Sequence, residues 1–469
     1  MLSSSSFGYW GVRENAPFFR FLPILVLVSQ VALSMGSVAS DLIRRIRTTL
    51  TEEDEMKRMK PCFTAALAIL AYAMPAFAVE GGKRGAAPLE MEKPAAPVPW
   101  VRYAPWPQAN WNEFNTLRDN ASPPVEGYQR VFGPITDGNP ENGKKLAFDR
   151  SRGGGCLACH VLPGGILPGN VGPDLSTIGT WGRTDWWLYN YIYDARVFNP
   201  TTMMPPWGRH GLYSPEEIRD IVAYLKTLKT PAQFKDPRDD PNRRVKEEPT
   251  YDPDDPFQNP AWGEGEKGEQ LFATVGPNGK SCASCHKDPK KEFRTWAARM
   301  PYYEPRMKKV LNTEEFITRH ARATTGADYP MQGEENTELA IYLRSLGRGV
   351  PINIRFRSAE ERAHAERGKA LMGRKIGQLN FACTDCHGLA ENKWIRGQFL
   401  TGSKNQVGHH PYYRTSQGEI WTIRKRFQWC GVAIRANELP PDAPEYADIE
   451  YYLTSLSNGK KVNTPGMGH

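Results

Sequence analysis

The sequence predicts a mostly α-helical protein that is built from three repeated units. Each unit opens with a segment that carries a glycine and an apolar pair, and a Cys-x-x-Cys-His sequence follows it. Each unit closes with an amphipathic segment that carries Tyr-Leu and has the i, i+3, i+4, i+7 apolar spacing of a helix. Such internal repetition is strong evidence for architecture. The opening segments are 143–148, 268–272 and 368–372, and the closing segments are 218–228, 339–346 and 449–456.

The Cys-x-x-Cys-His sequence is the attachment signature of c-type haem. Its two thiols bond to the vinyl groups of the porphyrin, and its histidine is the proximal ligand of the iron. A zinc site needs four closed ligands, whereas each motif offers three. We therefore expect three covalently bound c-type haems. The attachment and proximal residues are Cys156, Cys159 and His160; Cys282, Cys285 and His286; and Cys383, Cys386 and His387.

An opening helix that crosses a closing helix, with haem between them, is the plan of a class I cytochrome c. The predicted fold is therefore mostly α, with three class I cytochrome c modules. The composition is globular, with 40% hydrophobic and 11% aromatic residues, while 39 Pro and 42 Gly indicate long irregular segments. The net charge of +8 is compatible with anionic substrates or acidic partners. No long basic tract with interleaved aromatics occurs, so the sequence gives nucleic-acid binding no support.

Composition also predicts the domain organisation. Residues 79–130 are rich in Pro and Trp and form an expected extended arm. Residues 131–232 form a monohaem domain. A charged, Pro-rich linker at 233–257 separates it from a dihaem domain at 258–469.

The N-terminal residues 1–78 read as an upstream segment and a signal peptide. Basic residues at 57–60 precede a short apolar core, and an A-x-A site predicts cleavage after Ala78. The upstream apolar run at 21–33 is shorter than the roughly 20 residues of a membrane span. We prefer a true start at Met56 or Met59, with an N-terminal anchor as the alternative. Haem attachment outside the cytoplasmic membrane predicts a periplasmic protein without an integral membrane domain in the mature chain.

Each of the three units offers a candidate for the second axial ligand of its iron. In the first unit it is Met204, with Met203 as the alternative, at the place between motif and closing helix where such a ligand belongs. Both could instead be gap-filling core residues. In the second unit His320 is preferred and Met331 is the alternative.

Cys430 is the candidate in the third unit. Of eight cysteines, six lie in the haem motifs and Cys62 lies in the expected signal, which leaves Cys430 as the odd thiol. Arg424, Lys425 and Arg426 precede it, a setting that favours thiolate. A small buried hydrophobe and a solvated charged helix face are the ordinary alternatives.

The ordered motifs resemble those of the Sox sulfur-oxidation cytochromes. Residues 131–230 resemble SoxX, the monohaem subunit of SoxAX, and residues 258–466 resemble dihaem SoxA, so the chain is similar to a fused SoxXA. The matching segments are 156–160, 168–175 and Met204-Pro205 in the first part, and 281–286, 377–380, 426–430 and 457–459 in the second.

The resemblance implies a function. SoxAX-type proteins join thiosulfate to a cysteine of the carrier SoxYZ and release two electrons, so a small cytochrome c acceptor is implied. Cys430 matches the cysteine that ligates the active haem, and Arg426 matches the arginine beside it. The family's second ligating cysteine is replaced here by His320, which implies bis-His ligation. The alternatives are a thiosulfate dehydrogenase that forms tetrathionate and a multihaem electron carrier without catalysis.

Overall fold

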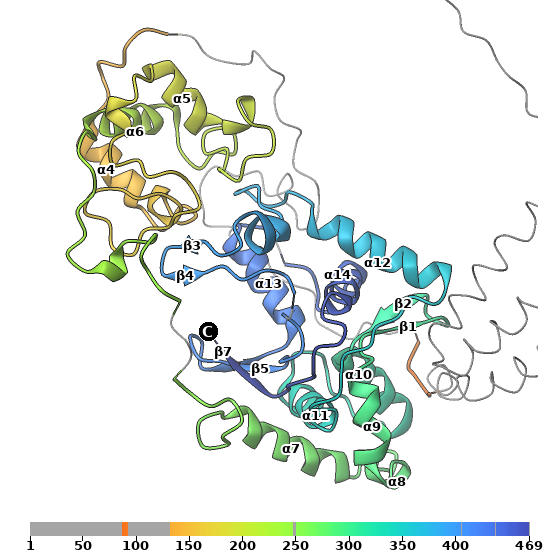
Figure 1. Ribbon diagram of the computed structural model, residues 1–469. Coiled ribbons are helices and arrows are strands. Elements are labelled where there is room, and N and C mark those ends of the chain that lie inside the picture. The colour runs from red at the N-terminus through yellow and green to blue at the C-terminus, as the bar shows by residue number, and fades with distance from the viewer. Residues whose placement is uncertain (1–86, 92–131, 247–249, 405, 437, 469) are drawn as a thin grey trace, which may run out of the picture. The chain divides into compact units, whose positions relative to one another are not determined.

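The computed structural model describes residues 87–91, 132–246, 250–404, 406–436 and 438–468 (Figure 1). The expected signal peptide, Cys62 and most of the expected arm lie outside the described residues. The described chain is mostly helical, as predicted, and its strands are short. None of its helices combines the length and the apolar character that a membrane crossing requires.

The first unit is formed by α4 (Pro140–Phe148), α5 (Asp185–Tyr193) and α6 (Pro215–Thr227). Asn139 caps α4, and Ser214 caps α6 in a capping box with Glu217, which satisfies amide groups that a helix start leaves free. The apolar faces of all three helices share one core, in which Ile218 and Ile221 are fully buried. This core positions the first Cys-x-x-Cys-His motif, which follows α4.

The second unit contains four longer helices and one hairpin. The helices are α7 (Ala261–Ala273), α9 (Pro289–Ala297), α10 (Thr313–Thr324) and α11 (Glu334–Ser345), and the short α8 (Cys282–Cys285) carries the motif thiols. Strands β1 (Tyr302–Glu304) and β2 (Lys309–Leu311) pair antiparallel, with Tyr303 opposite Val310. The hairpin leads directly into α10, so it sets where that helix begins.

The third unit contains α12 (Ala359–Met372), α13 (Ile423–Ala433) and α14 (Pro444–Ser455). A π-type turn at 385–389 carries Cys386 and His387. Strands β3 (Trp394–Ile395) and β4 (Gln398–Phe399) form a hairpin. Strands β5 (Tyr412–Arg414), β6 (Glu419–Trp421) and β7 (Gly466–Gly468) form a sheet with the order β6-β5-β7, in which β5 and β7 are parallel.

A glycine lies at the crossing of the opening and closing helices in each unit. The helix pairs are α4 with α6, α7 with α11, and α12 with α14. A Cβ atom at any of these glycines would collide with a backbone carbonyl of the partner helix, so the recurring glycine permits the close approach. The glycine and carbonyl pairs are Gly143 with Asp220, Gly268 with Glu338, and Gly368 with Asp448.

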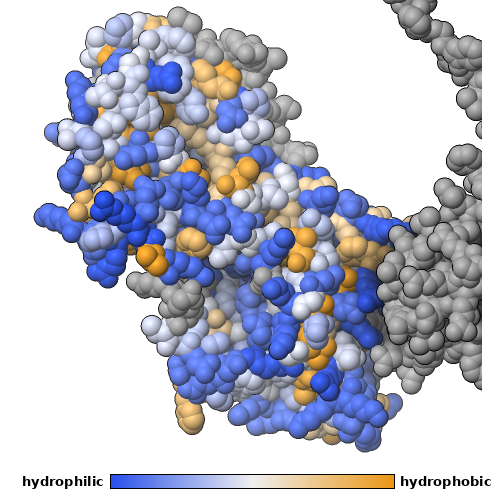
Figure 2. Space-filling model, viewed as in Figure 1, coloured by the Kyte–Doolittle hydropathy of each residue, from blue (hydrophilic) through white to orange (hydrophobic). Residues whose placement is uncertain are grey.

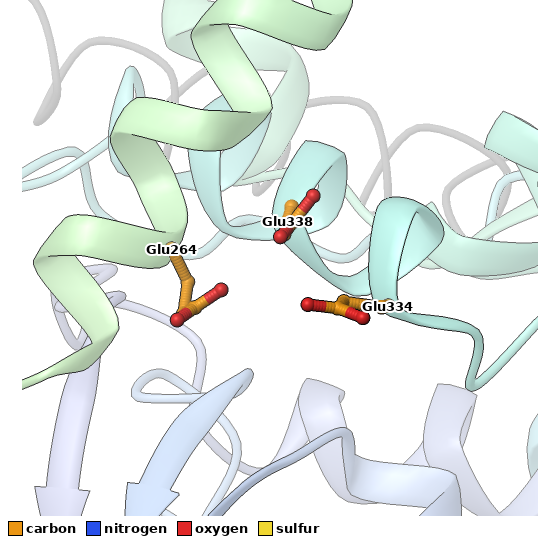
Figure 3. Close-up of side chains that lie close together, drawn as sticks. All are labelled: Glu264, Glu334 and Glu338. Atoms are coloured by element: carbon orange, nitrogen blue, oxygen red, sulfur yellow. The ribbon is translucent and has the colours of Figure 1, made fainter.

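Three carboxylates gather where α7 meets α11. Glu264 of α7 faces Glu334 and Glu338 of α11, with oxygen atoms within 4.8 Å of one another (Figure 3). The Lys267 ammonium lies 3.0 Å from the Glu264 carboxylate and 3.7 Å from that of Glu338. The positive charge of Lys267 therefore offsets part of the negative charge of this cluster, and the group belongs to the contact between the two helices.

Reciprocal hydrogen bonds join the first unit to the third. The ring Nδ1 of His210 lies 2.8 Å from the Gln378 carbonyl oxygen, and the Gln378 amide donates to the His210 carbonyl at 2.7 Å. Asn170 and Trp394 make a second reciprocal pair, at 2.8 and 3.1 Å. Arg244, from the expected linker, donates to the Arg396 carbonyl at 2.7 Å. The residues around the first and third motifs are therefore held against one another.

Candidate haem centres

One large cavity is lined by two of the three haem motifs. Its volume is about 2230 Å³, and its walls include the thiols and histidines of the first and third motifs. Much of the remaining wall is apolar, with Ile178, Leu188 and Leu225 among its residues. Figure 2 shows a largely hydrophilic face on which apolar side chains gather in the upper part, over the first unit. An apolar cavity with a thiol pair and an imidazole at each of two places fits covalently attached haem.

Burial dominates the chemistry of the attachment thiols. It raises the pKa of Cys156, Cys159, Cys383 and Cys386 to about 12. The four thiols therefore lie at the buried wall of the cavity, where thioether bonds to a haem would form.

Each motif histidine has its ring orientation set by a hydrogen-bond partner. The Nδ1 atoms of His160 and His387 lie 2.8 Å from the carbonyl oxygens of Pro173 and Thr401. Nδ1 of His286 lies 2.8 Å from a carboxylate oxygen of Glu292. This arrangement leaves Nε2 to bind a metal. Burial lowers the pKa of His160 and His387, which favours the neutral imidazole that metals require.

The first unit offers two methionines near its motif. Met203 and Met204 are half-buried, pack against the core of the unit and line the large cavity. The backbone N–H of Met204 donates to the Thr202 hydroxyl at 3.1 Å, which holds the loop. Both expected candidates therefore stand at the haem cavity, and Met204 stays our preferred ligand.

In the second unit the structure brings His320 to the motif histidine. The ring centres of His286 and His320 are 6.0 Å apart, with 55° between the ring planes. Two imidazoles that each bind one metal at about 2 Å have ring centres about 6 Å apart. The pair thus fits a single iron between the rings. Met331, the alternative, is buried in the chain between α10 and α11.

In the third unit Cys430 lies close to the motif thiols. It is on α13 and lines the large cavity together with Cys383, Cys386 and His387. After burial, the proximity of Cys430 is the next cause that raises the pKa of both Cys383 and Cys386. Within the described residues, Cys430 is the only cysteine outside the haem motifs.

The three cations that precede Cys430 have different environments. Arg424 is fully buried and pairs with two carboxylates, Glu315 at 3.3 Å and Glu450 at 2.7 Å. Lys425 pairs with Glu419 at 2.8 Å near the surface. Carboxylates therefore compensate two of the three cations that precede Cys430 in the sequence.

Arg426 is the third of these cations, and its environment differs from that of the other two. It lines the large cavity, and its side chain has no hydrogen bond or ion pair to any residue that the structure describes. The pKa of His387 is lowered by burial first and by the positive charge of Arg426 as well, which places that charge near the third motif. An uncompensated guanidinium at a cavity that also holds a thiol can bind a small anion.

Sequence reasoning left His409 and His410 without a clear role. Both line the large cavity, with ring centres 4.4 Å apart. Burial lowers the pKa of His409 to about 4 and that of His410 well below its usual value. The doublet therefore stands as a neutral wall of the cavity. No local pattern places it there, since its position depends on the turn into β5.

Comparisons with known proteins identify cytochrome c domains in this chain. The family model described as "SoxA/TsdA, cytochrome c domain" matches residues 267–352, and a "Cytochrome c" model matches residues 140–229. The L-cysteine S-thiosulfotransferase subunit SoxA of Pseudaminobacter salicylatoxidans is 32% identical over 215 residues, which are 45% of this chain and 74% of that relative. The chain belongs to the SoxA family. It is therefore a cytochrome with covalently bound c-type haem.

Other SoxA proteins are similar over the same share of the chain. The SoxA subunit of Paracoccus pantotrophus is 28% identical over 217 residues, which are 46% of this chain and 73% of the relative. A crystal structure of SoxXA from P. pantotrophus aligns with 45% of this chain and 80% of that chain, at 25% identity and a TM-score of 0.43.

Proposed function

We propose that this chain is an L-cysteine S-thiosulfotransferase, which joins thiosulfate to a cysteine of a carrier protein. SoxA relatives bear this name. The observation that carries the proposal is the meeting of Cys430 and the uncompensated Arg426 at the cavity of the third haem motif. A nucleophilic sulfur and a binding group for a sulfonate are the two parts that thiosulfate chemistry needs.

The reaction is an oxidation in which one S–S bond forms. The outer sulfur of thiosulfate bonds to the cysteine sulfur of the carrier, and two electrons and the thiol proton leave. Each c-type haem supplies a place for one electron. Arg426 would hold the sulfonate oxygens through charge-assisted hydrogen bonds, and Cys430 would be both an iron ligand and the sulfur-accepting group.

The finer assignments belong to the same proposal. We infer three haems in three class I cytochrome c modules, of which residues 131–232 form a SoxX-like part in a fused SoxXA chain. The axial pairs are His160 with Met204, His286 with His320, and His387 with Cys430. The shared cavity of the first and third motifs and the hydrogen bonds between His210 and Gln378 support a close pairing of these two haem sites.

The partners follow from the reaction. We propose thiosulfate as substrate, a SoxYZ-like carrier as the cysteine donor, a small cytochrome c as electron acceptor, and a periplasmic location. The covalent haems support that location, because their attachment takes place outside the cytoplasmic membrane.

Replacement of Cys430 tests the function. Cys430→Met should fold and retain all haems, because a thioether ligates iron and fills a similar volume. It should lose thiosulfate conjugation, because a thioether cannot accept sulfur. The assay is cytochrome c reduction that depends on both thiosulfate and the carrier, with haem content measured by mass in parallel. Turnover at the wild-type rate would place the sulfur chemistry elsewhere.

A tetrathionate-forming thiosulfate dehydrogenase is the second candidate, because the matching family model covers both SoxA and TsdA. Such an enzyme would couple two thiosulfates and would need no carrier. Tetrathionate as the product without carrier would favour it, whereas a thiosulfonated carrier favours the transferase. If Cys430→Ala kept full redox activity, the chain would be an electron carrier without catalysis.

A further inference from the structure

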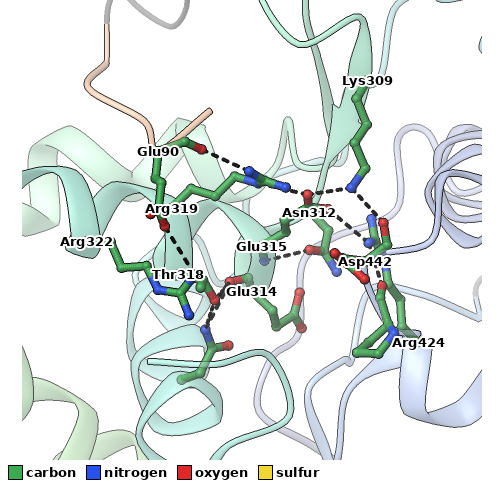
Figure 4. Close-up of polar contacts among 12 residues, drawn as sticks. Glu90, Lys309, Asn312, Glu314, Glu315, Thr318, Arg319, Arg322, Arg424 and Asp442 are labelled. Carbon is green, nitrogen blue, oxygen red and sulfur yellow. Dashed lines mark hydrogen bonds and ion pairs between the residues drawn. The ribbon is translucent and has the colours of Figure 1, made fainter. Parts of the chain in front are cut away.

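A short N-terminal segment, residues 87–91, binds along the ligand-bearing helix of the second unit. The backbone N–H of Glu90 donates to the Arg319 carbonyl at 3.1 Å, and the Arg319 guanidinium donates to the Glu90 carbonyl at 2.9 Å. The Glu90 carboxylate also pairs with Arg322 at 3.1 Å (Figure 4). The segment thus contacts α10 at residues that precede and follow His320.

An apolar anchor holds the same segment in place. Leu89 is 8% exposed and packs in a cluster with Met300, Tyr302, Leu311 and Phe316. Phe316 in turn stacks on the His320 ring, with 5.1 Å between the ring centres and 16° between the planes. The leucine therefore supports the aromatic side chain that lies against the proposed ligand.

The contact to His320 itself is a hydrogen bond from the ring. Its Nδ1 atom lies 2.8 Å from the carbonyl oxygen of Pro88. Since a carbonyl only accepts, Nδ1 carries the proton and Nε2 faces the other way as the metal-binding atom. Each of the three motif histidines has its hydrogen-bond partner within its own module. The partner of His320 is instead Pro88, which lies 232 residues upstream.

We propose that residues 87–91 complete the second haem site by fixing the orientation and tautomer of His320 through the Pro88 carbonyl. A hydrogen bond at Nδ1–H makes the imidazole a stronger electron donor and so stabilises the oxidised iron. The segment therefore lowers the potential of the second haem. This inference rests on the proposed pairing of His286 with His320. It makes residues 87–91, which precede the first haem motif, a functional part of the cytochrome.

The test compares two substitutions of the same kind in one segment. Leu89→Asp places a carboxylate in the apolar cluster and releases the segment, because an unpaired buried charge is costly. Met91→Asp is the matched control, since Met91 is 42% exposed. Leu89→Ala is a milder second variant, and Leu89→Met should behave as wild type. All variants are full-length, mature holoprotein.

The readouts are the individual haem potentials and the low-spin electron paramagnetic resonance spectrum. We expect Leu89→Asp, and Leu89→Ala to a smaller extent, to shift one potential to a more positive value and to change the bis-His signal alone. Unchanged potentials and spectra in folded Leu89→Asp and Leu89→Ala would overturn the inference. Absence of a bis-His signal in the wild type would instead overturn the axial pairing. Neither readout depends on thiosulfate turnover, so a failure of this inference can be distinguished from a failure of the proposed function.

Discussion

Arg424 of α13 and Glu315 of α10 form an ion pair, with 3.3 Å between Nη1 and Oε2, and both side chains are fully buried (Figure 4). Glu315 also forms an ion pair at 2.9 Å with Arg319, which directly precedes His320. Arg424 is on the same helix as Cys430. The pair therefore ties the helix that carries the proposed ligand of the second haem to the helix that carries the proposed ligand of the third.

Arg424→Met should strongly destabilise the protein. The substitution removes one partner of a buried network and leaves the carboxylates of Glu315 and Glu450 less compensated, which costs about 3–5 kcal/mol. Guanidinium unfolding of the holoprotein measures the effect. Lys425→Met, at the next position but near the surface, should cost less than about 1 kcal/mol. Equal effects of the two substitutions would show that the buried pair contributes little.

Glu314 should make stability depend on pH. Burial, followed by repulsion from Glu450, raises the pKa of Glu314 to about 7. The folded state then binds a proton that the unfolded state releases between pH 4.5 and about 7. Below about pH 4.5 Glu314 is protonated in both states and costs no stability. As the pH rises from there to about 7, the free energy of unfolding falls by up to about 3 kcal/mol.

Glu314→Gln should remove that loss, because an amide stays neutral at every pH. Unfolding midpoints at pH 5 and pH 8 should lie closer together in this variant than in the wild type. Glu335→Gln, at an exposed carboxylate, is the control and should retain the wild-type difference. An unchanged difference in Glu314→Gln would assign the pH dependence to other groups.

Two glycines of α7 should respond in opposite ways to alanine. Gly268→Ala places a methyl group against the Glu338 carbonyl of α11 and should force the helices apart, at the cost of about 1–3 kcal/mol that is typical of overpacking. Gly263 has open space around it, so Gly263→Ala should stabilise the protein by roughly 0.5–1 kcal/mol through helix propensity. Thermal unfolding compares them. Similar effects would mean that the α7–α11 crossing tolerates a wider spacing.

Arg426→Ala should weaken thiosulfate binding. The loss of a hydrogen bond to a charged group costs about 1.5–3 kcal/mol, so KM for thiosulfate should rise by roughly ten- to hundredfold. Lys425→Ala is the control from the same helix, because its ammonium pairs with Glu419 away from the cavity. An unchanged KM in Arg426→Ala would remove the arginine from the binding site.

The mass of the mature holoprotein should report three haems. All three motifs have thiols at the attachment spacing, and the bonds should survive acid–acetone extraction. Paired Cys→Ala substitutions at Cys282 and Cys285 should reduce the count by one and leave the spectrum of the other two. A count of two in fully matured wild type would contradict the three-module architecture.

The sequence alone was sufficient for the features that depend on local spacing. The thiols and histidine of a haem motif are within five residues, and a glycine at a fixed place in the opening helix is required wherever a partner backbone comes close. The position of Met204 and Cys430 between motif and closing helix could also be predicted, because the module repeats the same chain order. The axial roles of these residues and the domain boundaries stay predictions.

Only the tertiary structure decided which charges and carbonyls act at a distance. The run Arg424, Lys425 and Arg426 looks uniform in the sequence, but helix geometry turns the three side chains to different surroundings. Of the three, only Arg426 lines the cavity, and it has no carboxylate partner among the residues that the structure describes. The contact of Pro88 with His320 joins residues 232 positions apart. Such pairings have no local signature, because they are set by how the helices pack and not by the neighbours of either residue along the chain.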